Sequence, residues 1–447
     1  MGILEVDIIS KENIKPSFPT PSHLRTYKLS LLDQLIPSPY APIILFYPNN
    51  DHSDDLSNIP KRLELLKKSL SETLTQFYPL AGKTKGDLYI ECNDEGACFA
   101  EAHVSGCLSE FLSHPDLLLT HKFLPCEFVW KESCAVSNIQ VNVFRCGGIA
   151  IGLCISHKIL DGAALSTFLK AWASTARGSS EAVCPNFVST SLFPTSDNLW
   201  LRDSSMAMWG SMFKKGKSMT RRLVFHASAI ATLKAQATSL CVKHPTRLEV
   251  VSAFIWKHAM AASRENFGFQ KPSLLTHLVN LRRRMASPLS EYSIGNLLWI
   301  AAAQCMDKDH DQVGLQGLVG EIRGAISRID CDFVQKLQGH EEIRNSVMCE
   351  SLKEIGEVGS KDEVDYFGFS SWCNLGFYEA DFGWGKPIWI SSIGSSSPVF
   401  LNLTILVDTR LGDGIEAWVT LDEQDMARLV CNSELLTFAS LDPSPLI

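Results

Sequence analysis

Hydrophobic and polar positions follow two different periods on either side of His157. Over residues 149–155 every second residue is Ile or Leu, and this period of two predicts a β-strand. Over residues 165–172 the apolar positions lie three and four apart, which predicts an amphipathic helix. Asp161-Gly162 separates the two patterns, so we expect a strand, a turn and a helix in that order.

Similar patterns predict further elements along the chain. They indicate three helices: one from Pro60 to just before Pro79, one opened by the capping box Thr246-x-x-Glu249, and one over 315–329. They also indicate a strand at 88–91, a hairpin over 139–156 and strands within 389–418. Turns are expected at 395–397 and 411–414. Helices and strands mix throughout, which is typical of the α/β class.

The 447 residues exceed the size at which a single core usually stops growing, and this favours two domains. The periodicity is lost between about residues 184 and 216, where proline, serine and glycine collect. We therefore expect an N-terminal domain over 1–190, a crossover loop over 191–215 and a C-terminal domain over 216–447.

Composition narrows the function and the location. A net charge of −8 argues against nucleic acid or an anionic membrane surface as the main partner. No secretory signal and no apolar run near 18 residues is visible, so we expect no membrane insertion. The 14 cysteines form no Cys-x-x-Cys pair, which favours reduced thiols and a cytoplasmic location. No metal is expected, because no His and Cys spacing suits zinc and the acidic group at 307–311 is typical of a solvated loop.

His157 stands at the end of the predicted strand. An imidazole at such a junction between strand and helix can be half buried and open to a cleft, which suits a general base that must titrate near neutral pH. The His-x-x-x-Asp spacing to Asp161 is weak by itself in a chain with 12 histidines, and a hydrogen-bonded core histidine is the alternative.

A second motif, Asp381-Phe382-Gly383-Trp384-Gly385, is more specific. Gly383 and Gly385 on either side of Trp384 indicate a turn that needs positive φ or a close approach, anchored by the indole ring. In this order the two motifs resemble those of the plant BAHD acyl-CoA-dependent acyltransferases, above all the alkaloid and terpenoid acetyltransferases. Further matching segments spread over almost the whole chain at 29–34, 78–82, 280–285, 292–296 and 371–378.

The resemblance implies a monomer of two similar mixed-sheet α/β domains with a channel between them. Acyl-CoA and a small-molecule alcohol enter from opposite sides, no cofactor is tightly bound, and acetyl-CoA is the co-substrate. The expected reaction is transfer of acetyl to a hydroxyl of an alkaloid or terpenoid, with His157 as general base. A hydroxycinnamoyl- or benzoyl-CoA transferase acting on an alcohol or amine is the alternative, and a non-catalytic metabolite-binding relative is a further one. The sequence leaves the acceptor and the position acylated open.

Asp161 and Trp384 each have two interpretations. Asp161 either orients the imidazole, or its carboxylate points away and pairs with Arg282, as the resemblance implies; Gly162 then allows the tight turn. Trp384 either donates its indole N–H to the oxyanion or anchors the turn that begins at Asp381.

Binding residues are less well marked. The candidates for the CoA phosphates are Arg283, Arg284 and Lys386, unless these form a solvated patch, together with Thr246 at the start of a helix. The candidates for an aromatic wall of the acceptor pocket are Tyr40, Trp299 and Phe377, with plain core packing as the alternative.

Overall fold

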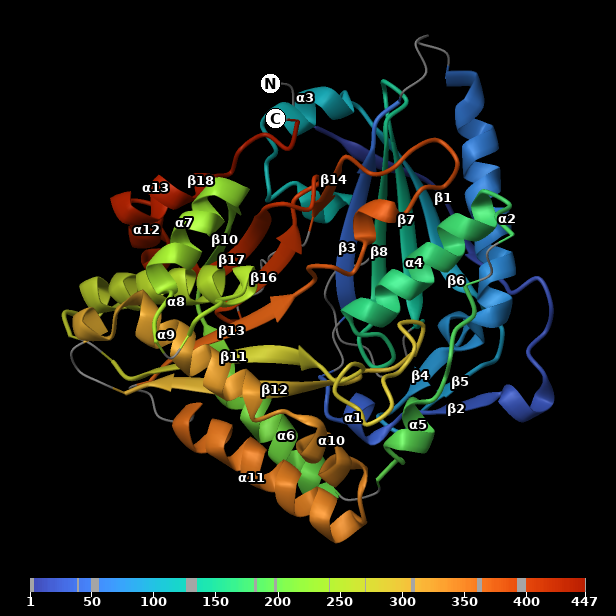
Figure 1. Ribbon diagram of the computed structural model, residues 1–447. Coiled ribbons are helices and arrows are strands. Elements are labelled where there is room, and N and C mark those ends of the chain that lie inside the picture. The colour runs from blue at the N-terminus through green and yellow to red at the C-terminus, as the bar shows by residue number, and fades with distance from the viewer. Residues whose placement is uncertain are drawn as a thin grey trace.

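The computed structural model describes residues 4–37, 40–49, 56–125, 135–180, 183–196, 199–240, 242–269, 271–306, 310–359, 364–391 and 399–446. These residues form two large sheets with helices packed around them, as Figure 1 shows, and each sheet has its own hydrophobic core. The expected mixed α/β class is confirmed.

The first sheet has six strands in the order β1-β6-β7-β8-β3-β14. They are β1 (Val6–Ile14), β6 (Ala97–Val104), β7 (Ser137–Phe144), β8 (Ile149–Ser156), β3 (Tyr40–Tyr47) and β14 (Trp389–Ser391). The predicted hairpin is the antiparallel pair β7 and β8. Two predicted helices, α2 (Ile59–Gln76) and α4 (Gly162–Ala176), pack side by side on one face of this sheet (Figure 1). Trp172 of α4 donates its indole N–H to the carbonyl of Leu66 in α2 at 3.1 Å.

Strand β14 departs from the predicted domain boundary. By sequence it belongs to the C-terminal domain, yet Trp389 pairs with Phe46 at the edge of the first sheet. Trp389 also stacks on Trp418 of the second sheet with ring centroids 5.7 Å apart. Arg222 lies over the Trp389 ring and forms a buried ion pair with Glu416 at 2.8 Å. The C-terminal half therefore completes the N-terminal sheet.

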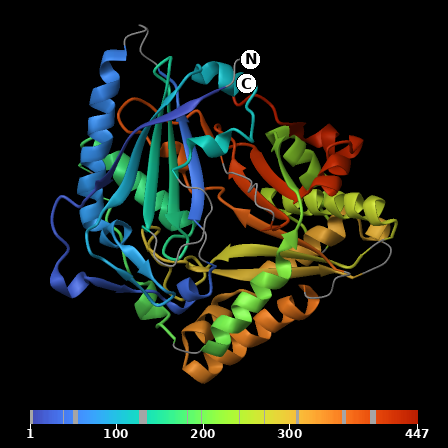
Figure 2. The same ribbon diagram turned by 180° about the vertical axis from the view of Figure 1, so that it is seen from behind.

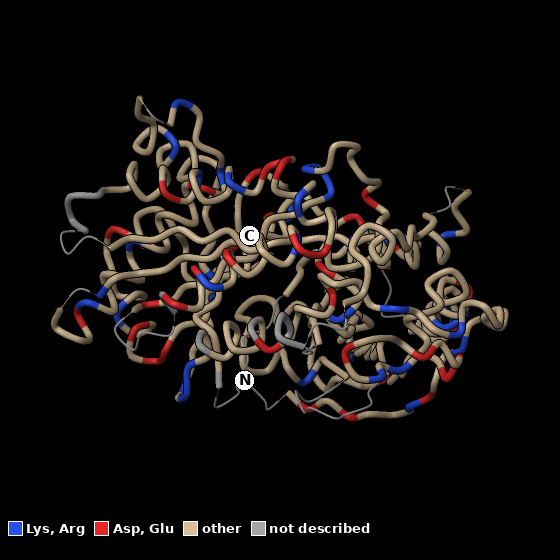
Figure 3. Tube along the Cα trace, turned by 90° about the horizontal axis from the view of Figure 1, so that it is seen from below, with Lys and Arg blue, Asp and Glu red and all other residues tan. Residues whose placement is uncertain are grey.

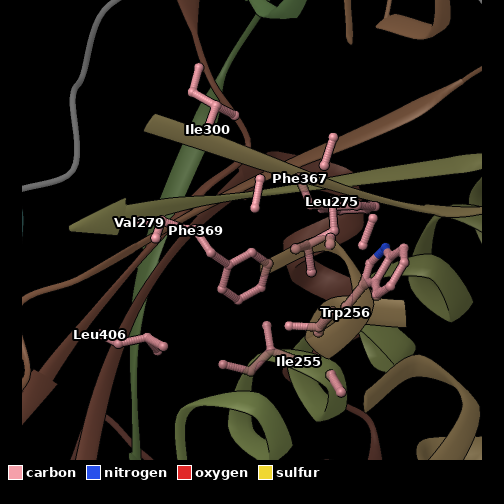
Figure 4. Close-up of a cluster of buried hydrophobic side chains, with 14 of the residues drawn as sticks. Ile255, Trp256, Leu275, Val279, Ile300, Phe367, Phe369 and Leu406 are labelled. Carbon is pink, nitrogen blue, oxygen red and sulfur yellow. The ribbon is translucent and has the colours of Figure 1, made fainter. Parts of the chain in front are cut away.

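The second sheet comes entirely from the C-terminal half, in the order β12-β11-β13-β16-β17-β10-β18. Its strands are β12 (Leu298–Cys305), β11 (Ser273–Asn280), β13 (Asp365–Ser371), β16 (Leu403–Asp408), β17 (Ile415–Asp422), β10 (Ser218–Phe225) and β18 (Ser440–Leu441). Helix α8 (Arg247–Phe267) begins at the predicted capping box, because Thr246 and Glu249 each accept the other's backbone N–H. Figure 4 shows the core that α8 makes with the sheet, where Ile255 and Trp256 approach Leu275 and Phe369.

The predicted crossover loop is largely helical. It contains α6 (Leu199–Met212), which packs along α11 (Glu341–Gly359), as Figures 1 and 2 both show. The buried residues Ser205, Met208 and Met212 lie three and four positions apart on α6. A serine in that short row weakens the apolar pattern, and the sequence therefore shows no clear helical period here.

Smaller elements fill the spaces between the sheets and the surface. They are α1 (Leu31–Gln34), α3 (Leu108–Ser113), α5 (Ser189–Leu192), α7 (Ala227–Ala237), α9 (His310–Ser327), α10 (Cys331–Gln338), α12 (Glu423–Leu429) and α13 (Ser433–Phe438), with β2 (Thr26–Lys28), β4 (Lys83–Lys85), β5 (Tyr89–Glu91), β9 (Lys214–Lys215) and β15 (Val399–Phe400). The turn at 411–414 lies between β16 and β17, whereas 395–397 fall outside the described residues. None of the described helices is both long and apolar enough to span a bilayer.

Candidate active site

His157 lies in a turn directly after β8, where both halves of the chain meet. The strand ends at Ser156, which pairs with Tyr40 of β3, and α4 begins at Gly162. The His157 side chain is half buried, as expected for a strand-end imidazole. The segment at 293–297 from the second domain runs beside this turn, with Leu160 bridged to Gly295.

Asn296 holds the imidazole from the second domain. Its side-chain Oδ1 lies 3.0 Å from His157 Nδ1, and its Nδ2 donates to the backbone carbonyl of His157 at 2.7 Å. Asp33 of α1 accepts from both the backbone N–H and Nδ2 of Asn296, at 2.7 and 2.8 Å. The sequence predicted neither residue for the site, although both lie in segments that carry the family resemblance.

Asp161 points away from the imidazole and toward Arg282. Arg282 donates to both carboxylate oxygens of Asp161, at 2.7 and 3.0 Å, and both side chains are buried. Asp161 also accepts from the backbone N–H groups of Ala164 and Leu297, at 2.9 and 3.1 Å. It therefore caps α4 and links the two domains, which is the arrangement the resemblance implied.

Gly162 serves a different purpose from the one expected. It is the first residue of α4 and has no positive φ. A Cβ at this position would lie 3.1 Å from Leu375 and 3.3 Å from Trp372. At these distances a larger residue would have to displace the two side chains by a few tenths of an ångström, so glycine suits the close approach of this segment.

The second motif forms a loop closed on its own aspartate. Asp381 Oδ1 accepts from the backbone N–H groups of Gly383 and Gly385, at 2.8 and 3.0 Å. Both glycines have positive φ, 106° and 112°, as expected from the motif. Arg177, the residue that follows α4, donates to the Asp381 carbonyl at 3.0 Å, which ties the loop to the N-terminal domain.

Trp384 lies at the far end of the sheet from His157. Its ring packs against Tyr47, with centroids 6.4 Å apart, and Arg62 lies over it at 5.5 Å. Tyr47 and Tyr40 are the two ends of β3, roughly 23 Å apart by the rise of a strand. An oxyanion formed at His157 is out of reach of this indole, so the oxyanion interpretation is corrected to the anchoring one.

The four candidate CoA contacts are scattered, and most are engaged elsewhere. Thr246 caps α8, and Arg284 donates to the carbonyls of Ile326 in the last turn of α9 and Ile329 just after it. Lys386 pairs with Glu379. Arg283 is exposed next to Arg282 and makes no side-chain hydrogen bond or ion pair within the described part of the chain. Arg283 is therefore the candidate cation that stays available.

The three aromatic acceptor candidates also separate. Trp299 donates to Ser351 Oγ at 3.0 Å and packs on Phe333, beside a cavity of about 20 Å³ that has room for little more than a water molecule. Phe377 is buried in the first core. Tyr40 is half buried beside the His157 turn and donates to the Ala135 carbonyl at 2.8 Å. Trp299 and Phe377 are core residues, and Tyr40 remains near the imidazole.

Two surface depressions in the described part of the chain lie away from His157. One of about 690 Å³ lies between α8, α12 and α13, and one of about 430 Å³ lies between β12, α9, α10 and α11. None of the candidate site residues lines either depression. Within the described residues, no three His, Cys, Asp or Glu side chains are grouped as for a metal ion. Figure 3 shows Lys and Arg interspersed with Asp and Glu along the described part of the trace.

Known proteins match this chain over almost its whole length. A model of the transferase family matches residues 4–436. A limonoid 7-O-acetyltransferase of Citrus sinensis is 45% identical over 99% of this chain and 100% of its own length. An epi-neemfruitin B 7-O-acetyltransferase of Melia azedarach is 44% identical with the same coverage. Among solved structures, vinorine synthase is 34% identical with a TM-score of 0.81, covering 98% of this chain and 99% of that one.

The chain therefore belongs to the transferase family of BAHD acyltransferases, and it is an acyltransferase. The resemblance read from the two motifs is confirmed, and so is the mixed α/β fold with two sheet-containing domains.

Proposed function

We propose that this protein is an acetyl-CoA-dependent O-acetyltransferase that acts on a terpenoid alcohol of the limonoid kind, with His157 as general base. The observation that carries the proposal is the half-buried imidazole at the end of β8, held by Asn296 from the other domain. The acetyl donor and the limonoid acceptor are supported by the names of the two relatives at 45% and 44% identity.

The proposed reaction is one direct transfer. The acceptor hydroxyl gives its proton to His157 while its oxygen attacks the thioester carbonyl of acetyl-CoA. The tetrahedral intermediate then expels the CoA thiolate, which takes the proton back from the imidazolium and leaves as the free thiol. An ester and CoA are the products. Because a thioester already has a good leaving group, this route needs no acyl-enzyme intermediate.

Other residues support this step from a distance. Asp161, paired with Arg282, keeps the turn in place and does not touch the imidazole. Arg283 is the cation proposed to meet a CoA phosphate, and Tyr40 is proposed to line the acceptor side of the site. We further propose a monomer that works in the cytoplasm, in line with the negative net charge and the scattered cysteines.

The test is a competition between acyl donors. Purified protein receives acetyl-CoA, benzoyl-CoA or coumaroyl-CoA with a panel of limonoid and alkaloid alcohols, while thiol release and product mass are followed. Acetyl transfer to a limonoid hydroxyl is the expected result. Turnover of aromatic thioesters alone would overturn the acetyl donor, and turnover of alkaloid alcohols alone would overturn the limonoid acceptor.

Binding of acyl-CoA without any turnover would favour the non-catalytic alternative. The same assay with His157→Ala tests whether His157 is the base, independently of which acceptor is used. Loss of thiol release with retained CoA affinity supports the base, whereas unchanged release removes it.

A further inference from the structure

Asp33 is a buried carboxylate directly behind the imidazole. It is 0% exposed and accepts four hydrogen bonds. Two come from Ser30, whose backbone N–H and Oγ donate to Oδ2 at 2.9 and 2.6 Å. The other two come from Asn296 and reach Oδ1. Within the described chain it forms no ion pair, so uncharged donors alone satisfy this carboxylate.

Asp33 determines how the Asn296 amide is oriented. The Nδ2 group faces two oxygens that only accept hydrogen bonds, Asp33 Oδ1 and the His157 carbonyl. A flipped amide would turn its own oxygen toward both of them, which is repulsive in a buried site. The side-chain oxygen of Asn296 is therefore the atom that faces His157 Nδ1 at 3.0 Å.

This orientation selects one form of the neutral imidazole. An amide oxygen only accepts, so His157 Nδ1 must donate and must carry the proton. The other ring nitrogen, Nε2, then has its lone pair free. We propose that Asp33 is a positioning residue that acts through Asn296 to keep His157 in the Nδ1–H form, with Nε2 as the nitrogen that takes the proton of the acceptor alcohol.

The arrangement suits both states of the base. When Nε2 gains a proton, the hydrogen bond from His157 Nδ1–H to Asn296 is kept. The negative charge of Asp33, which is hydrogen-bonded to the same Asn296, then stabilises the positively charged imidazolium. Burial raises the pKa of the Asp33 carboxyl, and the hydrogen bonds from Ser30 and Asn296 oppose that rise. The catalytic part of this inference depends on the proposed function, but the form of the imidazole does not.

The first experiment reads the imidazole directly. The full-length protein is labelled with ¹⁵N-histidine, and the two ring-nitrogen shifts of His157 are assigned by comparison with His157→Ala. We expect the Nδ1–H form in the unmodified protein and a mixture of both forms in Asn296→Ala and Asp33→Ala. An Nε2–H form in the unmodified protein overturns the proposal, even if no variant folds.

The second experiment follows turnover and uses Ser30→Ala as the matched control. That change removes the Ser30 Oγ bond to Asp33 Oδ2 but leaves the Oδ1 bonds to Asn296. In Asp33→Ala and Asn296→Ala we expect kcat to fall about 10- to 100-fold, with a lower plateau in the pH profile. The KM of these two variants should stay within about threefold of the unmodified protein. In Ser30→Ala we expect kcat itself to stay within about threefold. Equal losses in Ser30→Ala and Asp33→Ala would show a merely structural role.

The two experiments also separate this inference from the proposed function. An Nδ1–H imidazole in a protein without acetyltransferase activity supports the positioning by Asp33 and contradicts the proposed substrates. If Asp33→Ala keeps full acetyltransferase activity and the same form of the imidazole, the proposed function is supported and the positioning role of Asp33 is contradicted.

Discussion

The turn that carries His157 and the loop that begins at Asp381 are held in opposite ways. The turn depends on residues from distant parts of the sequence, because Asn296 and Asp33 fix the imidazole from outside. The loop is closed by its own Asp381, and its indole packs at the far end of β3. The motif that is more specific in the sequence thus closes on itself, whereas the weaker His157 motif is held by residues far away in the chain.

Removal of His157 is expected to have the largest effect. Under the proposed mechanism the acceptor alcohol loses its base in His157→Ala, so kcat should fall about 10²- to 10⁴-fold with little change in melting temperature. Steady-state thiol release measures this loss, and the exposed His23→Ala is the control. A fall of less than about threefold would contradict the general-base assignment.

Asp161→Asn is expected to act on stability first. It leaves Arg282 buried without its counter-charge, which should cost about 3–5 kcal/mol in the free energy of unfolding. Denaturant titration measures the cost, and Glu291→Gln, which breaks an exposed pair with Lys170, should cost less than about 1 kcal/mol. A stable but inactive Asp161→Asn protein would instead indicate a direct part in the reaction.

Asp381→Ala should affect stability less and chemistry hardly at all. It frees the two glycine N–H groups, for an expected cost of about 1–3 kcal/mol, while kcat of the folded fraction stays within about twofold. Asp381→Asn is the control, because one amide oxygen can still accept from both glycines. A large fall in kcat without a loss of stability would contradict the claim that the Asp381 loop serves chain geometry alone.

Trp384→Phe is expected to give the smallest change. Phenylalanine keeps the aromatic contact with Tyr47, and the indole N–H has no hydrogen-bond partner within the described chain. We expect kcat and KM within about twofold of the unmodified protein in steady-state kinetics. A 10²- to 10³-fold fall in kcat, typical of a lost oxyanion donor, would show that the indole reaches the reacting carbonyl.

Local features were the ones that could be predicted from the sequence. The strand, turn and helix around His157, the capping box of Thr246 and Glu249 and the positive φ of Gly383 each depend on residues within a few positions of one another. Short-range periodicity and turn chemistry are enough to specify such features.

Contacts between distant segments could not be predicted in this way. Asp33, His157 and Asn296 come from three separate parts of the chain, and no period marks a single Asp or Asn as buried. The available cation Arg283 and the engaged Arg284 are neighbours of the same type, and only the approach of the α9 carbonyls distinguishes them. The family resemblance located the segments, but not the bonds between them.

The late position of β14 has a consequence for synthesis of the chain on the ribosome. The other five strands of the first sheet are complete once Ser156 has emerged, yet β3 lacks its outer neighbour until Trp389 is made. At roughly 5–20 residues per second, that bare strand edge waits on the order of ten seconds or more. The nascent N-terminal half therefore offers an open edge to other chains, and prematurely terminated products are expected to aggregate.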